Sequence, residues 1–199
     1  NAKIVATGVT FDIKGDSVKA SNGAEGGSIT IDGVEAGNKI VAVIEYEGTD
    51  NYYSFTTLAD AVAKAQAGET VKLIADATGT GVVINKSITI DFNEKIYTVN
   101  KAVGSTGTAS NGFQILKGNT VTLKNGTLSV AASAADKFYI LVQNYADLTV
   151  IDMTLDGTNL DKWAFTDGDS YTLSNNSGAV NILGATNIIA NNDGDLAFA

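Results

Sequence analysis

One short pattern returns along most of the chain and limits its fold more than any other feature. A turn is followed by an apolar residue, a polar residue (mostly threonine), a second apolar residue, and then Asn, Asp or Gly. The clearest copies are Val71-Lys72-Leu73, Ile88-Thr89-Ile90, Val121-Thr122-Leu123, Leu148-Thr149-Val150 and Val180-Asn181-Ile182. Their starts lie 17, 33, 27 and 32 residues apart. Irregular repeats of this length are typical of solenoid folds.

A second short strand precedes each of the last four copies, across a polar turn. These strands are Val82–Ile84, Phe113–Ile115, Tyr139–Val142 and Tyr171–Leu173. The sequence therefore predicts an all-β fold, a parallel β-helix with two or three strands in each coil. If equivalent residues of successive coils lie over one another, Val, Ile and Leu point inward and Thr, Lys and Asp point outward. The alternative is an antiparallel sandwich, because Asn125-Gly126 between Leu123 and Leu128 suits a hairpin turn.

A short helix is predicted over residues 57–67, just before the first coil. Thr57 and Asp60 have the spacing of a capping box, and Asp60 would meet the positive end of the helix dipole. Leu58, Ala61, Val62 and Ala65 form one apolar stripe. Gly68 suits a left-handed position just after the helix. Because this stripe is small and rich in alanine, we expect the helix to cap the open end of the first coil.

The first fifty residues contain β-branched runs between Gly, Asn and Asp residues. These runs are Ile4–Ala6, Val9–Ile13, Ser28–Ile31 and Lys39–Tyr46. We expect a small β-rich N-terminal unit over residues 1–50, with its strands antiparallel, and the parallel β-helix over residues 51–199. A separate sandwich-like module is the alternative for the first part.

Composition removes most active-site chemistries. The 199 residues include no Cys, His or Pro, and all 13 basic residues are Lys. The chain therefore lacks the thiolate, imidazole and guanidinium groups on which most nucleophilic, acid–base and phosphate-binding sites depend.

The net charge of −9 would repel nucleic acid and anionic membrane surfaces. The longest aliphatic run, Ile40–Ile44, is too short to span a bilayer, so no membrane insertion is expected. Since the chain begins at Asn1 without a signal-like segment, we interpret it as a mature product or an excised piece.

From about Tyr52 to Leu155 the chain resembles the right-handed parallel β-helix of the pectin-lyase-like superfamily. The segments that carry this resemblance are YYSFTTLADAVAKAQAGETVKLIADAT, VVINKSITIDFNEKIYTV, NTVTLKNGTLSV and ADLTVIDMTLDG. It is most similar to non-catalytic modules in large surface proteins of gut and soil bacteria. The superfamily's lyases use an Arg base with acidic calcium ligands, and its polygalacturonases use Asp with His, Arg and Lys. Neither set can be carried over to a chain without Arg and His.

Four residues are candidates for ligand binding. The only tryptophan, Trp163, lies with Phe165 in the longest interruption of the strand pattern, residues 157–170. An aromatic side chain beside acids and amides could bind a sugar ring or a partner protein, or it could pack the loop onto the coil. Asp152 and Asp156 could form a carboxylate pair, as a glycosidase requires, or could be solvated turn residues.

We expect no cofactor, and the alternative is calcium. Asp167 with Asp169, and Asp193 with Asp195, could supply oxygen ligands. Neither cluster is followed by the Glu of an EF-hand loop. The alternative for both clusters is a turn built from residues that tolerate left-handed conformations.

These patterns predict a non-enzymatic, adhesin-like extracellular surface module that binds glycan or protein on a cell surface through its side loops. One alternative is a structural subunit of a phage spike, capsid ornament or extracellular filament, on a virion or cell surface. It is suggested by the segment Asn187–Ala199, which shows no lid and could allow self-assembly into a homo-oligomer. A further alternative is a polysaccharide lyase or hydrolase.

Overall fold

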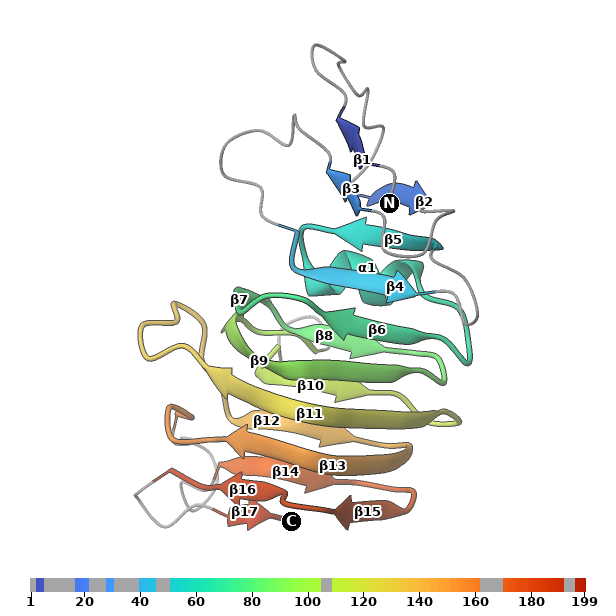
Figure 1. The fold of residues 1–199 in the computed structure, drawn as a ribbon. Helices are drawn as coiled ribbons and strands as arrows, with labels where there is room; N and C mark the ends of the chain where they lie inside the picture. Colours follow the sequence, from blue (N-terminus) through green and yellow to red (C-terminus); the bar gives the residue numbers. More distant parts are fainter. Residues whose placement is uncertain are drawn as a thin grey trace.

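The structure is a computed structural model that describes residues 3–5, 17–21, 28–30, 40–45, 51–104, 109–161, 170–191 and 196–199. Within these ranges, side chains are described for residues 40–44 and from residue 53 onward. The fold is all-β with one helix among the described residues, and its strands stack as a parallel β-solenoid (Figure 1).

The N-terminal elements are β1 (Lys3–Val5), β2 (Ser17–Ser21), β3 (Ser28–Thr30), β4 (Ala42–Glu45), β5 (Asn51–Phe55) and the helix α1 (Leu58–Lys64). The solenoid strands are β6 (Thr70–Leu73), β7 (Ala77–Thr80), β8 (Val82–Ile84), β9 (Thr89–Lys101), β10 (Asn111–Ile115), β11 (Thr120–Val130), β12 (Ile140–Asn144), β13 (Asp147–Asp156), β14 (Tyr171–Asn175), β15 (Val180–Leu183), β16 (Asn187–Ile189) and β17 (Leu196–Phe198).

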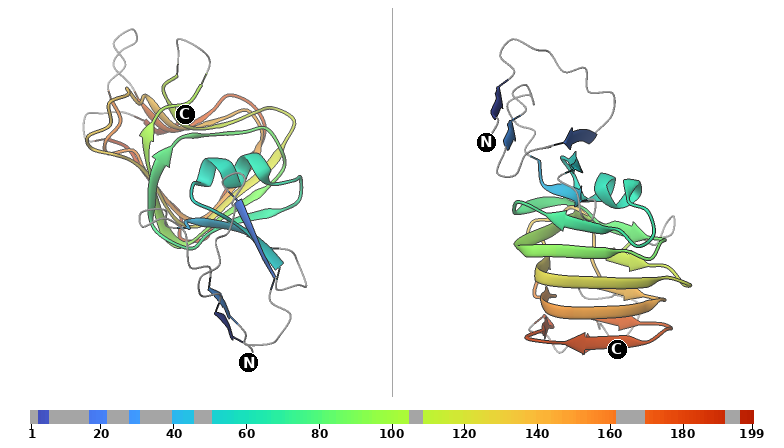
Figure 2. Two further views of the ribbon diagram at one scale, coloured as in Figure 1. Left: turned by 90° about the horizontal axis from the view of Figure 1, so that it is seen from above. Right: turned by 45° about the vertical axis from the view of Figure 1, so that its right-hand side comes forward.

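The coil has three walls. In the first wall, β6 and the N-terminal halves of β9, β11 and β13 are followed by β15. In the second wall, the C-terminal halves of the same three strands lie between β7 and β16. In the third wall, the order is β8, β10, β12, β14 and β17. Because β9, β11 and β13 each continue around a corner, they belong to two walls at once (Figure 2).

All pairings within the three walls are parallel and place equivalent residues of the repeat side by side. Thr122 lies between Thr89 and Thr149, and Leu123 lies between Ile90 and Val150. The threonines are partly exposed, whereas these apolar neighbours are fully buried. The prediction of a parallel coil is therefore confirmed, and the antiparallel sandwich is wrong.

Asn125-Gly126, which suited a hairpin, instead bends β11 without reversing it. Asn125 has φ 60°, and the residues on both sides of this dipeptide stay in parallel register with β13. A single residue in the left-handed region is enough to turn the chain from the first wall into the second.

Large aromatic side chains pack against one another in the core. The ring of Phe113 stacks on Phe92 with centroids 6.5 Å apart and tilts against Tyr97 at 6.1 Å. The phenol of Tyr97 donates to the carbonyl oxygen of Thr80 over 2.7 Å. Burial raises the pKa of this phenol, because the ionised form would be poorly solvated.

The predicted helix is present but shorter than residues 57–67. Thr57 is its N-cap, and the Thr57 hydroxyl oxygen accepts the backbone N–H of Asp60 over 3.1 Å. Leu58, Ala61 and Val62 are buried in the core as the stripe predicted. The helix ends at Lys64, so the prediction that Gly68 directly follows it is wrong. Gly68 has φ +89° and lies in the turn before β6, where its N–H donates to the carbonyl of Ser87.

The N-terminal strands partly join the solenoid. β5 pairs antiparallel with β2 and β4, and β4 pairs antiparallel with β6. β1 and β3 pair in parallel, so the expectation of an entirely antiparallel unit is wrong for these two strands. The predicted strand at Val9–Ile13 lies outside the described residues. The division between residues 50 and 51 stays a prediction.

Candidate functional site

A column of left-handed residues marks the corner between the first and second walls. Asn93, Glu94, Asn125 and Asp152 have φ values of 49°, 62°, 60° and 52°, and Gly184 follows them with 62°. Their neighbours pair coil on coil, so the bends stack on one another. Asn, Asp and Gly tolerate this conformation better than other residues, which explains their recurrence. Glu94 does not share that tolerance.

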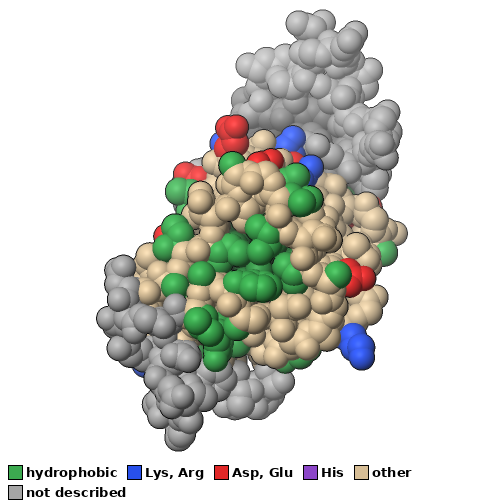
Figure 3. Space-filling view, turned by 90° about the horizontal axis from the view of Figure 1, so that it is seen from below, with side chains coloured by type: hydrophobic (Ala, Val, Ile, Leu, Met, Phe, Trp, Pro, Cys, Tyr) green, Lys and Arg blue, Asp and Glu red, His purple; other side chains and the backbone are tan. Residues whose placement is uncertain are grey.

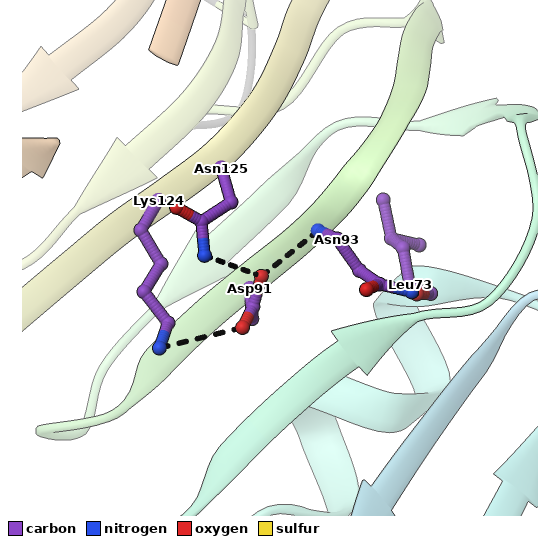
Figure 4. Close-up of polar contacts among 5 residues, drawn as sticks. All are labelled: Leu73, Asp91, Asn93, Lys124 and Asn125. Atoms are coloured by element: carbon purple, nitrogen blue, oxygen red, sulfur yellow. Dashed lines mark hydrogen bonds and ion pairs between the residues drawn. The ribbon is translucent and has the colours of Figure 1, made fainter. Parts of the chain in front are cut away.

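Asp91 organises the beginning of this corner (Figure 4). Its Oδ1 atom accepts the backbone N–H of Asn93 over 2.8 Å and the side-chain amide of Asn125 over 3.2 Å. Its Oδ2 atom lies 3.3 Å from the ammonium nitrogen of Lys124. The amide of Asn93 in turn donates to the carbonyl of Leu73 over 3.0 Å. The corner of β9 is thereby bonded to the strands before and after it.

Asp152 has the equivalent role at the other end of the column. Its Oδ1 atom accepts the backbone N–H of Ala185 over 2.8 Å. A Cβ atom on Gly184 would lie only 2.2 Å from the same oxygen, so a larger residue there would have to displace the Asp152 carboxylate. The side chains of Asn93, Asn125 and Asp152 are thus held in position by hydrogen bonds to neighbouring coils.

An open polar hollow of about 700 Å³ lies on the outside of this corner. Its lining comes from three successive coils and consists of Asn93, Glu94, Asn125, Gly126, Thr127, Asp152 and Thr154. Among the described residues, the side chains of Glu94, Thr127 and Thr154 have no hydrogen-bond partner in the protein. Amide, hydroxyl and carboxylate groups are therefore presented to solvent on a rigid scaffold, without an aromatic side chain in the lining.

Of the predicted ligand residues, the structure places Asp152 in this hollow. Asp156 does not line it. It is four residues further along the second wall, where its Oδ1 atom accepts the backbone N–H of Thr158 over 3.0 Å. This bond is typical of a turn-stabilising aspartate. The carboxylate that joins Asp152 in the hollow is Glu94.

The other candidates lie outside the described residues and stay predictions. They are Trp163, Phe165, Asp167, Asp169, Asp193 and Asp195. The described part of the chain contains no group of three acidic side chains that could hold a metal ion. Nor does it contain a helix of the length and hydropathy needed to span a membrane.

Sequence reasoning missed most of the hollow. Asn93, Glu94, Asn125, Thr127 and Thr154 were not singled out as ligand residues. A signal was present, because Asn93, Asn125 and Asp152 each follow shortly after a copy of the repeated pattern. A residue with a left-handed backbone conformation at that place predicts a corner of the coil. The outward-facing residues that follow this corner in successive coils then lie on the same wall.

A second hollow of about 320 Å³ lies at the opposite edge of the first wall, where the turns after β10, β12 and β14 stack. It contains Tyr145, Asn119, Asp147 and Ser177. Most of these polar groups already stabilise the turns. Asp147 accepts from the backbone of Ala179 over 2.9 Å, and Asn119 donates to the carbonyl of Leu116 over 2.7 Å. We therefore consider the larger corner hollow the better candidate site.

Comparison with known proteins identifies no relative: no family model, curated protein sequence or solved structure matches this chain.

Proposed function

We propose that the protein is a non-enzymatic extracellular surface module that binds a neutral glycan in the corner hollow. The observation that carries this proposal is the lining of the hollow, in which three successive coils present hydroxyl, amide and carboxylate groups side by side. Successive parallel strands lie about 4.8 Å apart. A ligand with hydroxyl groups repeated along its length would find similar partners on each coil.

The chemistry of the lining favours a glycan over a protein or an anion. Protein interfaces concentrate their binding energy in buried aromatic and Arg side chains, and the hollow contains neither. Glu94 and Asp152, together with a net charge of −9, would repel an anionic ligand. A neutral polyhydroxylated chain is not repelled by these carboxylates and does not depend on aromatic or Arg side chains. Its hydroxyl groups can donate to carboxylates and accept from amides.

Hydrolysis is the less favoured alternative for the same hollow. Glu94 and Asp152 supply two carboxylates, the minimum for a glycosidase. Both residues are exposed to solvent, whereas a glycosidase keeps its general acid protonated by burying it. Incubation with oligosaccharides would release new reducing ends if the alternative were correct, and Glu94→Gln or Asp152→Asn would abolish that release.

The finer description of the fold belongs to this proposal. We infer a right-handed coil of the pectin-lyase-like type with α1 as its cap. The support is the quoted sequence resemblance and the burial of Leu58 and Ala61, both 0 % exposed. Extracellular placement on a cell surface follows from the resemblance and from the glycan ligand. A spike or filament subunit is kept as the structural alternative.

Isothermal titration calorimetry with a panel of neutral oligosaccharides tests the proposal. The informative variant is Thr127→Val with Thr154→Val, which removes two neighbouring hydroxyls from the hollow without changing side-chain shape. Its control is Thr122→Val with Thr149→Val, the equivalent pair on the same two strands but on the first wall.

Two lost hydrogen bonds predict affinity about 10-fold weaker for the first variant, and unchanged affinity for the control. Equal affinities for the two variants would contradict binding at the corner. The absence of heat with every oligosaccharide of the panel would contradict glycan binding itself.

A further inference from the structure

Glu94 differs from the other side chains in the left-handed column. Asn93, Asn125 and Asp152 are residue types that tolerate this conformation, and each bonds to a neighbouring coil. Glu94 has φ 62° without being such a type. Its side chain is exposed, and it has no hydrogen-bond or ion-pair partner among the described residues. The contacts within the fold therefore give no reason for a glutamate at this position.

The corner that contains Glu94 is also longer than the corners after it. In β11 and β13 the corner is a single residue, whereas residues 92–94 of β9 all stand opposite Asn125. Phe92 is fully buried in the core, and Asn93 bonds to the preceding coil. Glu94 is thus the residue of this longer corner whose side chain is left free at the hollow.

The left-handed conformation of Glu94 costs the fold free energy, because the Cβ atom crowds the following carbonyl oxygen. Backbone strain of this kind persists only where the surrounding structure imposes it, and it clusters at binding and active sites. Asparagine or glycine at the same position would reduce the cost. What glutamate adds over these two residues is a free carboxylate in the lining of the hollow.

The free polar atoms of the hollow are mostly hydrogen-bond acceptors. The side-chain amide nitrogens of Asn93 and Asn125 already donate within the protein (Figure 4). A carboxylate has acceptor oxygens only. Both oxygens of Glu94 and the Oδ2 atom of Asp152 have no partner among the described residues. A ligand that fits this lining must therefore supply hydrogen-bond donors.

Hydrophobic contact contributes little to this lining. Seen along the solenoid axis, hydrophobic side chains gather in the centre of the coil, with backbone and other side chains around them (Figure 3). The hollow lies on the outside of the coil, and none of its lining residues is hydrophobic. Recognition in the hollow therefore depends on polar groups.

We propose that Glu94 determines which glycans the hollow binds, by accepting hydrogen bonds from two hydroxyl groups on adjacent carbons of one sugar ring. This inference rests on the proposed function and names its ligand class, glycans with free adjacent hydroxyls. Hydrogen bonds to a carboxylate are charge-assisted and stronger than bonds between neutral groups. A glycan that is O-methylated at these hydroxyls has no donors, and it would leave the carboxylate desolvated without a partner.

Isothermal titration calorimetry tests the inference with xylopentaose, mannopentaose and cellopentaose, each free and fully O-methylated. Glu94→Gln keeps the length of the side chain and the left-handed backbone, but it removes the charge and one acceptor oxygen. Affinity for a free sugar that binds the original chain should fall at least about 10-fold. The matched control is Glu69→Gln, in the turn before β6 and outside the hollow, which should bind like the original chain.

Methylation of the sugar provides the second arm of the same experiment. The original chain should bind the O-methylated sugar at least about 10-fold more weakly than the free sugar. This difference should be smaller in Glu94→Gln, because the two changes remove the same hydrogen bonds.

Thermal unfolding without ligand separates a binding role of Glu94 from a structural role. Glu94→Gln should leave the unfolding midpoint unchanged. Glu94→Asn should raise the midpoint by about 2–4 °C, because asparagine tolerates the left-handed conformation, and should also weaken sugar binding. A lower midpoint for Glu94→Gln would show that the side chain stabilises the fold, and would overturn the inference.

The calorimetry distinguishes failure of this inference from failure of the proposed function. Equal affinity of the original chain and Glu94→Gln for a free sugar would overturn the role of Glu94 and leave glycan binding intact. The absence of heat with all three free sugars would contradict glycan binding, and the role of Glu94 with it.

Discussion

The side-chain amide of Asn144 donates to the side-chain oxygen of Asn175, its neighbour in the next coil, over 2.8 Å. Asn144 is fully buried, and its side chain also bonds to both backbone groups of Ala146, at 2.7 and 3.1 Å. The same column begins with two buried isoleucines, Ile84 and Ile115. A polar ladder thus replaces an apolar one where the chain turns from the third wall into the first.

Replacing Asn144 is expected to destabilise the fold strongly. Asn144→Ala leaves the backbone groups of Ala146 without their partners in a buried turn, so the free energy of unfolding should fall by about 3 kcal/mol. Urea denaturation monitored by circular dichroism measures the change. Asn100→Ala, on an exposed position of β9, should change the same quantity by less than about 0.5 kcal/mol. Similar losses for the two variants would mean that the ladder contributes little.

Gly126, at the corner, should tolerate substitution by alanine far less well than Gly118, which lies in a turn. A Cβ atom on Gly126 would lie 2.4 Å from the Cβ of Phe92 and 2.6 Å from the carbonyl oxygen of Lys95. Gly126→Ala must therefore displace the neighbouring coil, at a cost of about 3 kcal/mol. Gly118, at φ +85°, has open space around it, so Gly118→Ala should cost only about 1 kcal/mol of backbone strain. Thermal unfolding of both variants would compare them, and the reverse order would contradict the tight corner.

Tyr97 should make the fold sensitive to alkaline pH. Its ordinary pKa is about 10, and burial raises the folded-state pKa above that value. Below the ordinary value the phenol is neutral in both states, and its contribution to stability is fully present. As pH rises past it, the unfolded chain releases the proton while the folded chain retains it. The free energy of unfolding therefore falls by up to about 1.4 kcal/mol per pH unit.

Tyr97→Phe isolates this effect from the titration of the lysines. At neutral pH the variant should be less stable by about 1 kcal/mol, because the hydrogen bond to Thr80 is lost. Above about pH 10 its stability should fall less steeply than that of the original chain, so that the difference shrinks. Urea denaturation at a series of pH values measures both slopes, and parallel curves would contradict a buried, neutral Tyr97.

The sequence predicted the first and third walls well because their strands have simple alternation between polar turns. Val121 to Leu123 and Phe113 to Ile115 lie within β11 and β10 as expected. The helix was recognised from Thr57 and its apolar stripe. These features depend on local spacing, which a single sequence contains.

The second wall and the corner hollow were harder to predict, because they depend on one residue per coil. Asn125-Gly126 has the composition of a hairpin turn, and only pairing with the neighbouring coils turns it into a corner. Asp152 was selected as a carboxylate near Asp156, whereas the hollow that it lines also contains Glu94, which comes from β9, two coils away. Which side chains meet across coils depends on register, and local patterns do not specify it.

The central claim is that equivalent residues of successive coils lie side by side in parallel strands, and a disulfide tests it most directly. The chain has no cysteine, so Thr122→Cys with Thr149→Cys introduces a single pair, at positions that are neighbours in β11 and β13. Parallel neighbours lie about 4.8 Å apart, within disulfide range. Mild oxidation should cross-link this pair within the monomer, and should leave the pair Thr122→Cys with Thr154→Cys reduced. Cross-linking of the second pair but not the first would contradict the stacked coil.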